Sequence, residues 1–161
     1  MIRCLPGKAG KSCKIDLSQK TQQERKVRMK EYLVTEYLEK QSIACAVSAQ
    51  NWEEASRQAA QILIDKGAIR SEYLTRMMEK LEKERSYMVL TSGVAVIHAR
   101  PGEDVCKNSI SLLTLKQPVE FGNANYDPVA VVFMLAATDD NSHIRLMMAV
   151  AQKLSQPDIK E

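Results

Sequence analysis

The apolar run from Val129 to Ala137 constrains the fold of this chain more than any other feature. Its nine residues carry no charged or hydroxyl side chain, and the run is too short to span a membrane as a helix. A strand that is apolar at every position must be buried on both faces, and helices packed on either side of a sheet provide that cover. The run therefore predicts a central strand in a layered α/β protein.

Helical and strand-like segments alternate before and after this run. Apolar segments between residues 94 and 115 follow each other too closely for a helical crossover, which favours a mixed sheet over an all-parallel one. The pattern predicts a three-layer α/β/α sandwich with a mixed central sheet of about four to five strands. Helices are expected over residues 30–41, 52–66, 71–85 and 143–154, with caps at Asn51 and Ser71, and strands over 43–47, 87–90, 94–97, 110–115 and 129–137.

Charge is distributed unevenly along the 161 residues. Residues 1–30 contain nine of the 23 lysines and arginines but only two of the 20 acidic residues, and they show no clear hydrophobic periodicity. We therefore expect residues 1–29 to form a basic, flexible leader and residues 30–161 to form one domain. Because the leader lacks aromatic residues, its charge favours a solvated tail, and we expect no nucleic-acid partner.

The N-terminus and the cysteines indicate the cellular compartment. The first eight residues include charged residues, proline and glycine where a signal peptide needs an apolar core, which predicts a cytoplasmic protein. The four cysteines lack Cys-x-x-Cys spacing and form no zinc-like grouping with the histidines. We expect reduced thiols, no structural metal and no cofactor.

Two histidines occur in the chain, and each is expected where a strand or a helix begins or ends. His98 closes the apolar run that starts at Gly93, and Arg100 follows two residues later. His143 follows a capping cluster over 139–142, in the first turn of a helix, where free amides and the helix dipole favour anions. If the fold joins these ends, a phosphoryl group on His98 would meet His143, Arg100 and the amides after Ser142.

This set of groups suits phosphoryl transfer. A neutral imidazole attacks phosphorus through one nitrogen while an acceptor holds its other N–H, and the product is a reactive phosphoramidate. The transferred group spreads its charge over its oxygens, so cations and N–H donors can stabilise it. His98 is therefore the predicted phosphoacceptor, with Arg100 and Ser142 as predicted phosphate-binding residues.

Each of these residues also has an interpretation without chemistry. A single histidine is more often a surface residue or a satisfied polar group, and a surface cation explains Arg100 equally well. Ser142 is more often a plain helix cap, and Asp139-Asp140 fits a solvated turn before a helix. Cys106 has no spacing that pairs it with either histidine. An unrelated binding domain with two incidental histidines stays open as an alternative.

Several motifs occur in a fixed order over residues 30–154. In that order they resemble the fructose/mannitol-type enzyme IIA of the phosphoenolpyruvate-dependent sugar phosphotransferase system. The His-Ala-Arg-Pro form at residues 98–101, after Tyr87-Met88-Val89-Leu90, is most similar to the ascorbate and pentitol branch. The motifs are Gly93 to Leu115 with Gly102-Glu103 after Arg-Pro, Pro118-Val119-Glu120-Phe121-Gly122, Asp127-Pro128, Leu135-Ala136-Ala137 and Asn141-Ser142-His143.

The resemblance implies a transferase with a phosphohistidine intermediate. His98 would accept a phosphoryl group on its tele nitrogen from phosphorylated HPr and pass it to a cysteine of an enzyme IIB partner, which serves a membrane enzyme IIC permease. His143 matches the second active-site histidine, which supports the first. The implied role is uptake of a sugar or sugar derivative, with the ascorbate or pentitol type favoured. The alternative is a nitrogen-related regulatory enzyme IIA that signals through phosphorylation-dependent protein binding.

Three departures from the family pattern bear on the site. Ile97 stands where the family usually has proline before the histidine. The mannitol branch has an arginine in the preceding helix, whereas residues 82–85 here read Glu-Lys-Glu-Arg and offer no assigned counterpart. The sequence ends before a last helical region found in many relatives. We expect this edge of the sheet to be less covered, or closed by a partner chain such as a second copy in a homodimer.

Overall fold

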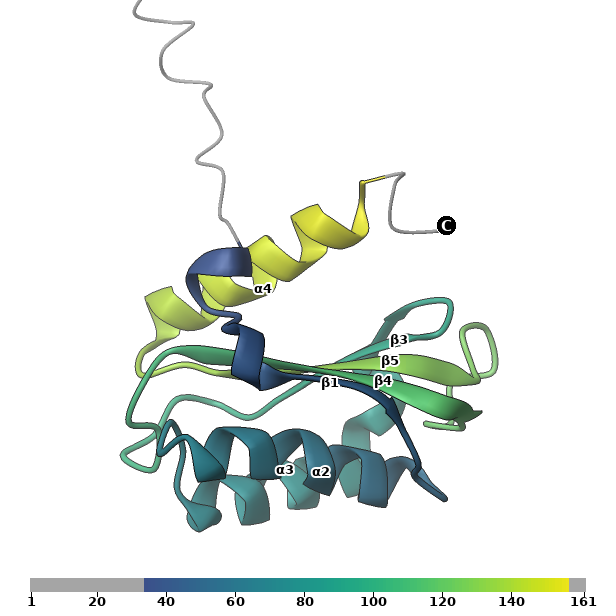
Figure 1. Ribbon diagram of the computed structural model, residues 1–161, viewed down its shortest axis with the longest axis horizontal. Helices are drawn as coiled ribbons and strands as arrows, with labels where there is room; N and C mark the ends of the chain where they lie inside the picture. The colour runs from purple at the N-terminus through teal and green to yellow at the C-terminus, as the bar shows by residue number, and fades with distance from the viewer. Residues whose placement is uncertain (1–33, 157–161) are drawn as a thin grey trace, which may run out of the picture. The chain divides into compact units, whose positions relative to one another are not determined.

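A five-stranded mixed sheet with helices on both faces makes up the computed structural model, which describes residues 34–156. The strand order is β1-β4-β5-β3-β2. Helices α2 and α3 cover one face of the sheet, and α4 covers the other (Figure 1). The predicted three-layer sandwich is confirmed, and the predicted leader lies outside the described residues. The elements are η1 (Val34–Glu36), η2 (Lys40–Ser42), β1 (Ile43–Val47), α2 (Trp52–Asp65), α3 (Ser71–Glu84), η3 (Arg85–Met88), β2 (Val89–Thr91), β3 (Val94–His98), β4 (Ser109–Val119), β5 (Val129–Ala136) and α4 (Asp140–Leu154).

Strand β5 occupies the middle of the sheet, as its apolar run predicts. It pairs antiparallel with β4 and parallel with β3. Val132 and Met134 pack in the core beneath α2 and α3, whereas Phe133 and Leu135 pack in the core beneath α4. Full burial of an aliphatic or aromatic side chain contributes about 1.5–3 kcal/mol, so these two cores hold the helices on the sheet.

Local sequence signals set the helix ends, with one correction. The Asn51 side chain caps α2 by accepting a hydrogen bond from the Glu54 amide at 2.9 Å, and Asp139 caps α4 in the same way through the Ser142 amide at 2.9 Å. The predicted cap at Ser71 is wrong, because Ser71 is the first residue of α3 and follows Arg70, which forms no side-chain cap bond. None of the helices within residues 34–156 is long and apolar enough to span a membrane.

The predicted helix over residues 30–41 is wrong in its described part. Residues 34–42 contain two short 3₁₀ helices instead. The Tyr37 carbonyl accepts a hydrogen bond from the Ile110 amide at 3.0 Å, so β4 takes the acceptor that a continuing helix would need. Val34, Tyr37 and Leu38 pack against the core under α4. Tertiary contacts therefore override the helical spacing of this segment.

Two strands differ from their predicted ranges by more than one residue. Residues 85–88 form the 3₁₀ helix η3, so β2 begins only at Val89. Strand β4 continues past Leu115 to Val119 and passes through Pro118. It tolerates a proline there because residue 118 lies in the irregular stretch of the pairing with β5, between Thr114 and Val119, and beyond Leu115, the last residue of β4 that pairs with β1.

Candidate functional site

The two histidines lie side by side at one end of the sheet. His98 is the last residue of β3 and pairs with Leu135 of β5. Residues 137–139 link β5 to α4, whose first turn carries His143. The two ring centroids are 5.0 Å apart, and the ring planes are inclined at 47°. The fold brings together the two residues that the sequence analysis singled out.

The alternation of β3 directs His98 to the face that carries α4. Val96 packs in the core under α4, whereas Ala95 and Ile97 pack in the core under α2 and α3. Ile97 is fully buried and pairs with Met134. Isoleucine in place of the family's usual proline therefore keeps β3 regular up to the histidine.

A single hydrogen bond fixes the tautomer of His98. Its Nδ1 lies 3.1 Å from the Val96 carbonyl oxygen. A carbonyl can only accept, so Nδ1 carries the proton and the lone pair of the neutral ring is on Nε2. No described residue forms a hydrogen bond with Nε2. The imidazole therefore presents its nucleophilic nitrogen away from its backbone anchor.

Both histidines are held in the neutral form. Burial lowers the pKa of His98 to about 4, helped by the charges of Lys80 and His143 and opposed by the bond to the Val96 carbonyl. Burial and Lys80 also lower the pKa of His143, against the opposing charge of Asp140. The Nε2 atom of His143 is buried without a hydrogen-bond partner among the described residues. Near neutral pH the site holds two uncharged imidazoles.

Lys80 is the cation that the sequence analysis missed. It is half-buried on α3, and its ammonium group forms no hydrogen bond or ion pair within residues 34–156, although Glu79, Glu82 and Glu84 lie on the same helix. Its positive charge helps to lower the pKa of both imidazoles. Lys80 follows Tyr73 by two helical turns and so lies on the side of α3 that faces the sheet. A charged residue on that side of the helix was the sequence signal that could have identified it.

The two predicted phosphate-binding residues have different surroundings. Arg100 is exposed, and its guanidinium forms no hydrogen bond or ion pair with any other described residue. Ser142 is 7% exposed, and its hydroxyl donates to Asp139 at 2.6 Å and accepts from Asn108 at 3.1 Å. The amide of Ser142 is bonded to Asp139, and the amide of His143 to the Asp139 carbonyl. Direct phosphate binding by Ser142 would require these cap bonds to break.

Arg85 does not belong to the histidine site. Its guanidinium lies over the Trp52 ring, 5.0 Å from the centroid, and it donates to the Glu82 carbonyl at 3.3 Å. Trp52 begins α2, which follows the end of β1 farthest from the histidines. Of the basic residues that precede the motif on α3 and η3, Lys80 is the one whose charge reaches the imidazoles.

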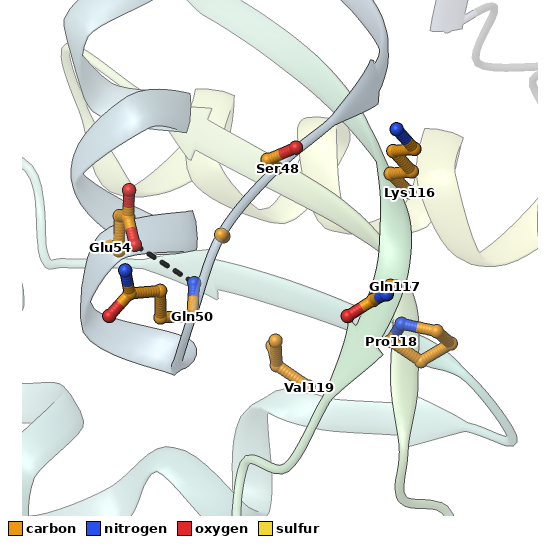
Figure 2. Close-up of a pocket in the computed structure, with 8 residues that line it drawn as sticks. Ser48, Gln50, Glu54, Lys116, Gln117, Pro118 and Val119 are labelled. Carbon is orange, nitrogen blue, oxygen red and sulfur yellow. Dashed lines mark hydrogen bonds between the residues drawn. The ribbon is translucent and has the colours of Figure 1, made fainter.

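A polar recess of about 360 Å³ lies at the other end of the sheet, between the segment after β1, the start of α2 and the end of β4 (Figure 2). Lys116 and Gln117 of β4 border it. The Glu54 carboxylate on its wall accepts hydrogen bonds from the Gln50 amide at 2.8 Å and from the Gln58 side chain at 3.3 Å. The recess shares no residue with the histidine pair, which we take as the candidate site.

Comparison with known proteins identifies the family of the chain. Residues 36–161 match the family model described as phosphoenolpyruvate-dependent sugar phosphotransferase system, EIIA 2. The chain belongs to this enzyme IIA family. Both histidines lie in the matched region, and the family assigns the chain a phosphotransferase role.

Named relatives place this enzyme IIA in the ascorbate and pentitol branch. The ascorbate-specific EIIA component of Escherichia coli K12 is 34% identical over 105 residues, which cover 65% of this chain and 68% of the relative. The corresponding component of Shigella boydii is 33% identical over the same length.

Solved structures give the same fold. A putative PTS IIA domain from Streptococcus pyogenes is 38% identical, covers 70% of each chain and superposes with a TM-score of 0.61. The cryptic mannitol-specific enzyme IIA CmtB of Escherichia coli is 32% identical, covers 78% of this chain and 85% of its own, and has a TM-score of 0.70. The enzyme IIA fold predicted from the motifs is confirmed.

Proposed function

We propose that His98 carries a phosphoryl group on Nε2 between two partner proteins. The observation that carries the proposal is the pair of imidazoles 5.0 Å apart in which the Nδ1 of His98 is held by the Val96 carbonyl at 3.1 Å. The hydrogen bond leaves one nitrogen with a lone pair, and the lowered pKa keeps that lone pair free near neutral pH.

The transfer proceeds in two steps. In the first, the Nε2 lone pair attacks phosphorus on the phosphohistidine of an HPr-type donor. The phosphorus–nitrogen bond of the donor breaks, and its electron pair stays on the donor nitrogen. In the second, a cysteine thiolate of an enzyme IIB partner attacks the same phosphorus, and the bond to Nε2 breaks. The proton stays on Nδ1 throughout, in its hydrogen bond to the Val96 carbonyl.

Three groups stabilise the phosphoryl oxygens in this proposal. The buried Nε2 of His143, when it carries its proton, donates to an oxygen and gains the partner that it lacks among the described residues. The unpaired ammonium of Lys80 and the unpaired guanidinium of Arg100 supply positive charge. Ser142 contributes through the cap that holds the first turn of α4.

The family and the named relatives support a class of transported compound and a set of partners. Ascorbate-specific components at 33–34% identity favour ascorbate or a related sugar derivative. Membership of the enzyme IIA family supports an enzyme IIB acceptor that serves an enzyme IIC permease. A mannitol enzyme IIA from Escherichia coli has been solved in complex with phosphorylated enzyme IIB, but it is 20% identical to this chain, so the likeness shows the fold alone. A nitrogen regulatory protein is 20% identical, a likeness that carries the fold alone. We place this phosphocarrier in the cytoplasm.

Incubation with enzyme I, HPr and phosphoenolpyruvate tests the proposal. The wild type should gain one acid-labile phosphoryl group, and His98→Ala should gain none. His143→Ala should still accept some phosphoryl group but pass it to enzyme IIB more slowly. Phosphorylation that survives His98→Ala would end the proposal, and wild-type transfer by His143→Ala would remove His143 from the site.

A further inference from the structure

A buried tyrosine joins the two strands at the point where the histidine stands. Tyr73 of α3 is fully buried, and its hydroxyl donates to the Leu135 carbonyl at 2.6 Å. The same hydroxyl accepts a hydrogen bond from the Ala99 amide at 2.9 Å. Ala99 follows His98, and Leu135 is the register partner of His98. The amide and the carbonyl are therefore linked through a side chain from the helix.

This arrangement has a consequence for the spacing of the strands. In a parallel pair, the amide after a paired residue and the carbonyl of its partner are the groups that can bond directly. Here a hydroxyl stands between them, so β3 and β5 are held apart just beyond His98. Burial raises the pKa of Tyr73 to about 12, so the phenol keeps its proton and can donate at any working pH.

The next turn of α3 binds the segment that follows His98. Arg76 binds the Asp104 carboxylate through two nitrogens, at 2.6 Å and 2.8 Å, and donates to the Arg100 carbonyl at 3.1 Å. Its guanidinium also lies 5.4 Å from the centroid of the Tyr73 ring. Helix α3 therefore holds the backbone at Ala99, Arg100 and Asp104.

We infer that Tyr73 is a positioning residue for His98. Its hydroxyl fixes the peptide group that follows the histidine and sets the separation of the strands that carry His98 and lead to His143. The Val96 carbonyl orients the ring about its own axis, whereas Tyr73 fixes the backbone on which the ring stands. The catalytic consequence rests on the proposed phosphoryl transfer, but the structural consequence does not.

Tyr73→Phe tests this role because it keeps the ring and removes both hydrogen bonds. We expect the rate constant for phosphoryl acceptance at saturating phospho-HPr to fall by about 10- to 100-fold, since a misplacement of about 1 Å can cost about 10²-fold. The KM for phospho-HPr should stay unchanged, because a fully buried side chain cannot touch the donor. In NMR spectra, the Ala99 amide should exchange faster and the pKa of His98 should rise towards its ordinary value.

Two control variants separate positioning from general effects. Tyr126→Phe removes the hydroxyl of a tyrosine in the turn at the other end of the sheet and should match the wild type in every readout. Leu63→Val weakens the core of α2 and should lower the free energy of unfolding without moving the His98 pKa or the Ala99 amide exchange.

The outcomes distinguish this inference from the proposed function. The positioning role would be overturned if Tyr73→Phe kept the wild-type rate constant, the wild-type exchange of the Ala99 amide and the wild-type pKa of His98. A raised KM at an unchanged rate constant would overturn it as well. The NMR measurements need no phosphoryl donor. If the wild type accepts no phosphoryl group but Tyr73→Phe still moves the Ala99 and His98 signals, the proposed function fails and the positioning role stands.

Discussion

Replacing His98 by glutamine should remove much of the acid sensitivity of folding. The pKa of His98 is lowered from 6.5 to about 4 in the folded protein. Between these two pH values the unfolded chain binds a proton that the folded chain excludes. The free energy of unfolding is therefore fully retained above the unfolded pKa and falls as the pH drops from 6.5 towards 4.

The size of this loss follows from the two pKa values. Linkage gives a loss of about 2 kcal/mol from His98 alone between about pH 7.5 and about pH 5, where most carboxylates are still ionised. Urea denaturation at both pH values, in the wild type and in His98→Gln, measures it. The variant should lose about 2 kcal/mol less than the wild type, whatever its own stability at neutral pH. Equal losses in the two proteins would refute the reasoning that burial and Lys80 keep His98 neutral.

Lys80→Gln should slow phosphoryl transfer to and from His98 and raise the pKa of both histidines, because it removes the charge that disfavours their protonation. NMR titration and single-turnover kinetics check this, with the exposed Lys83→Gln as a control; equal effects of the two substitutions would contradict a local role for Lys80. Asp139→Ala should lower the free energy of unfolding by about 0.5–2 kcal/mol through loss of the α4 cap, and Asp139→Asn should recover most of it. Urea denaturation decides, and an unchanged midpoint in Asp139→Ala would argue against the cap.

The sequence predicts those parts of the site that depend on where helices and strands begin and end. The unbroken apolar run of β5, the histidine at the end of β3 and the acidic cap before His143 are all local patterns, and together they place two imidazoles at one end of a sheet. The motif order adds the family.

What the sequence does not reveal depends on contacts between distant segments. Several glutamates near Lys80 on the same helix could pair with its ammonium group. The sequence alone therefore does not show that this group lacks a carboxylate partner in the described fold. Tyr73 has the pattern of an ordinary core residue, and only the fold shows its hydroxyl between Ala99 and Leu135. Tyr37 does not continue a helix, because its carbonyl accepts a hydrogen bond from the Ile110 amide of β4.

The short link between β5 and α4 makes the site sensitive to chain length. One residue added to or removed from the link over 137–139 would turn α4 by about 100° relative to the strand, at 3.6 residues per turn, and carry the His143 ring away from His98. The turn over 120–128, at the other end of β5, imposes no such phase on the two rings. Insertions and deletions among homologues should therefore be rare in the link.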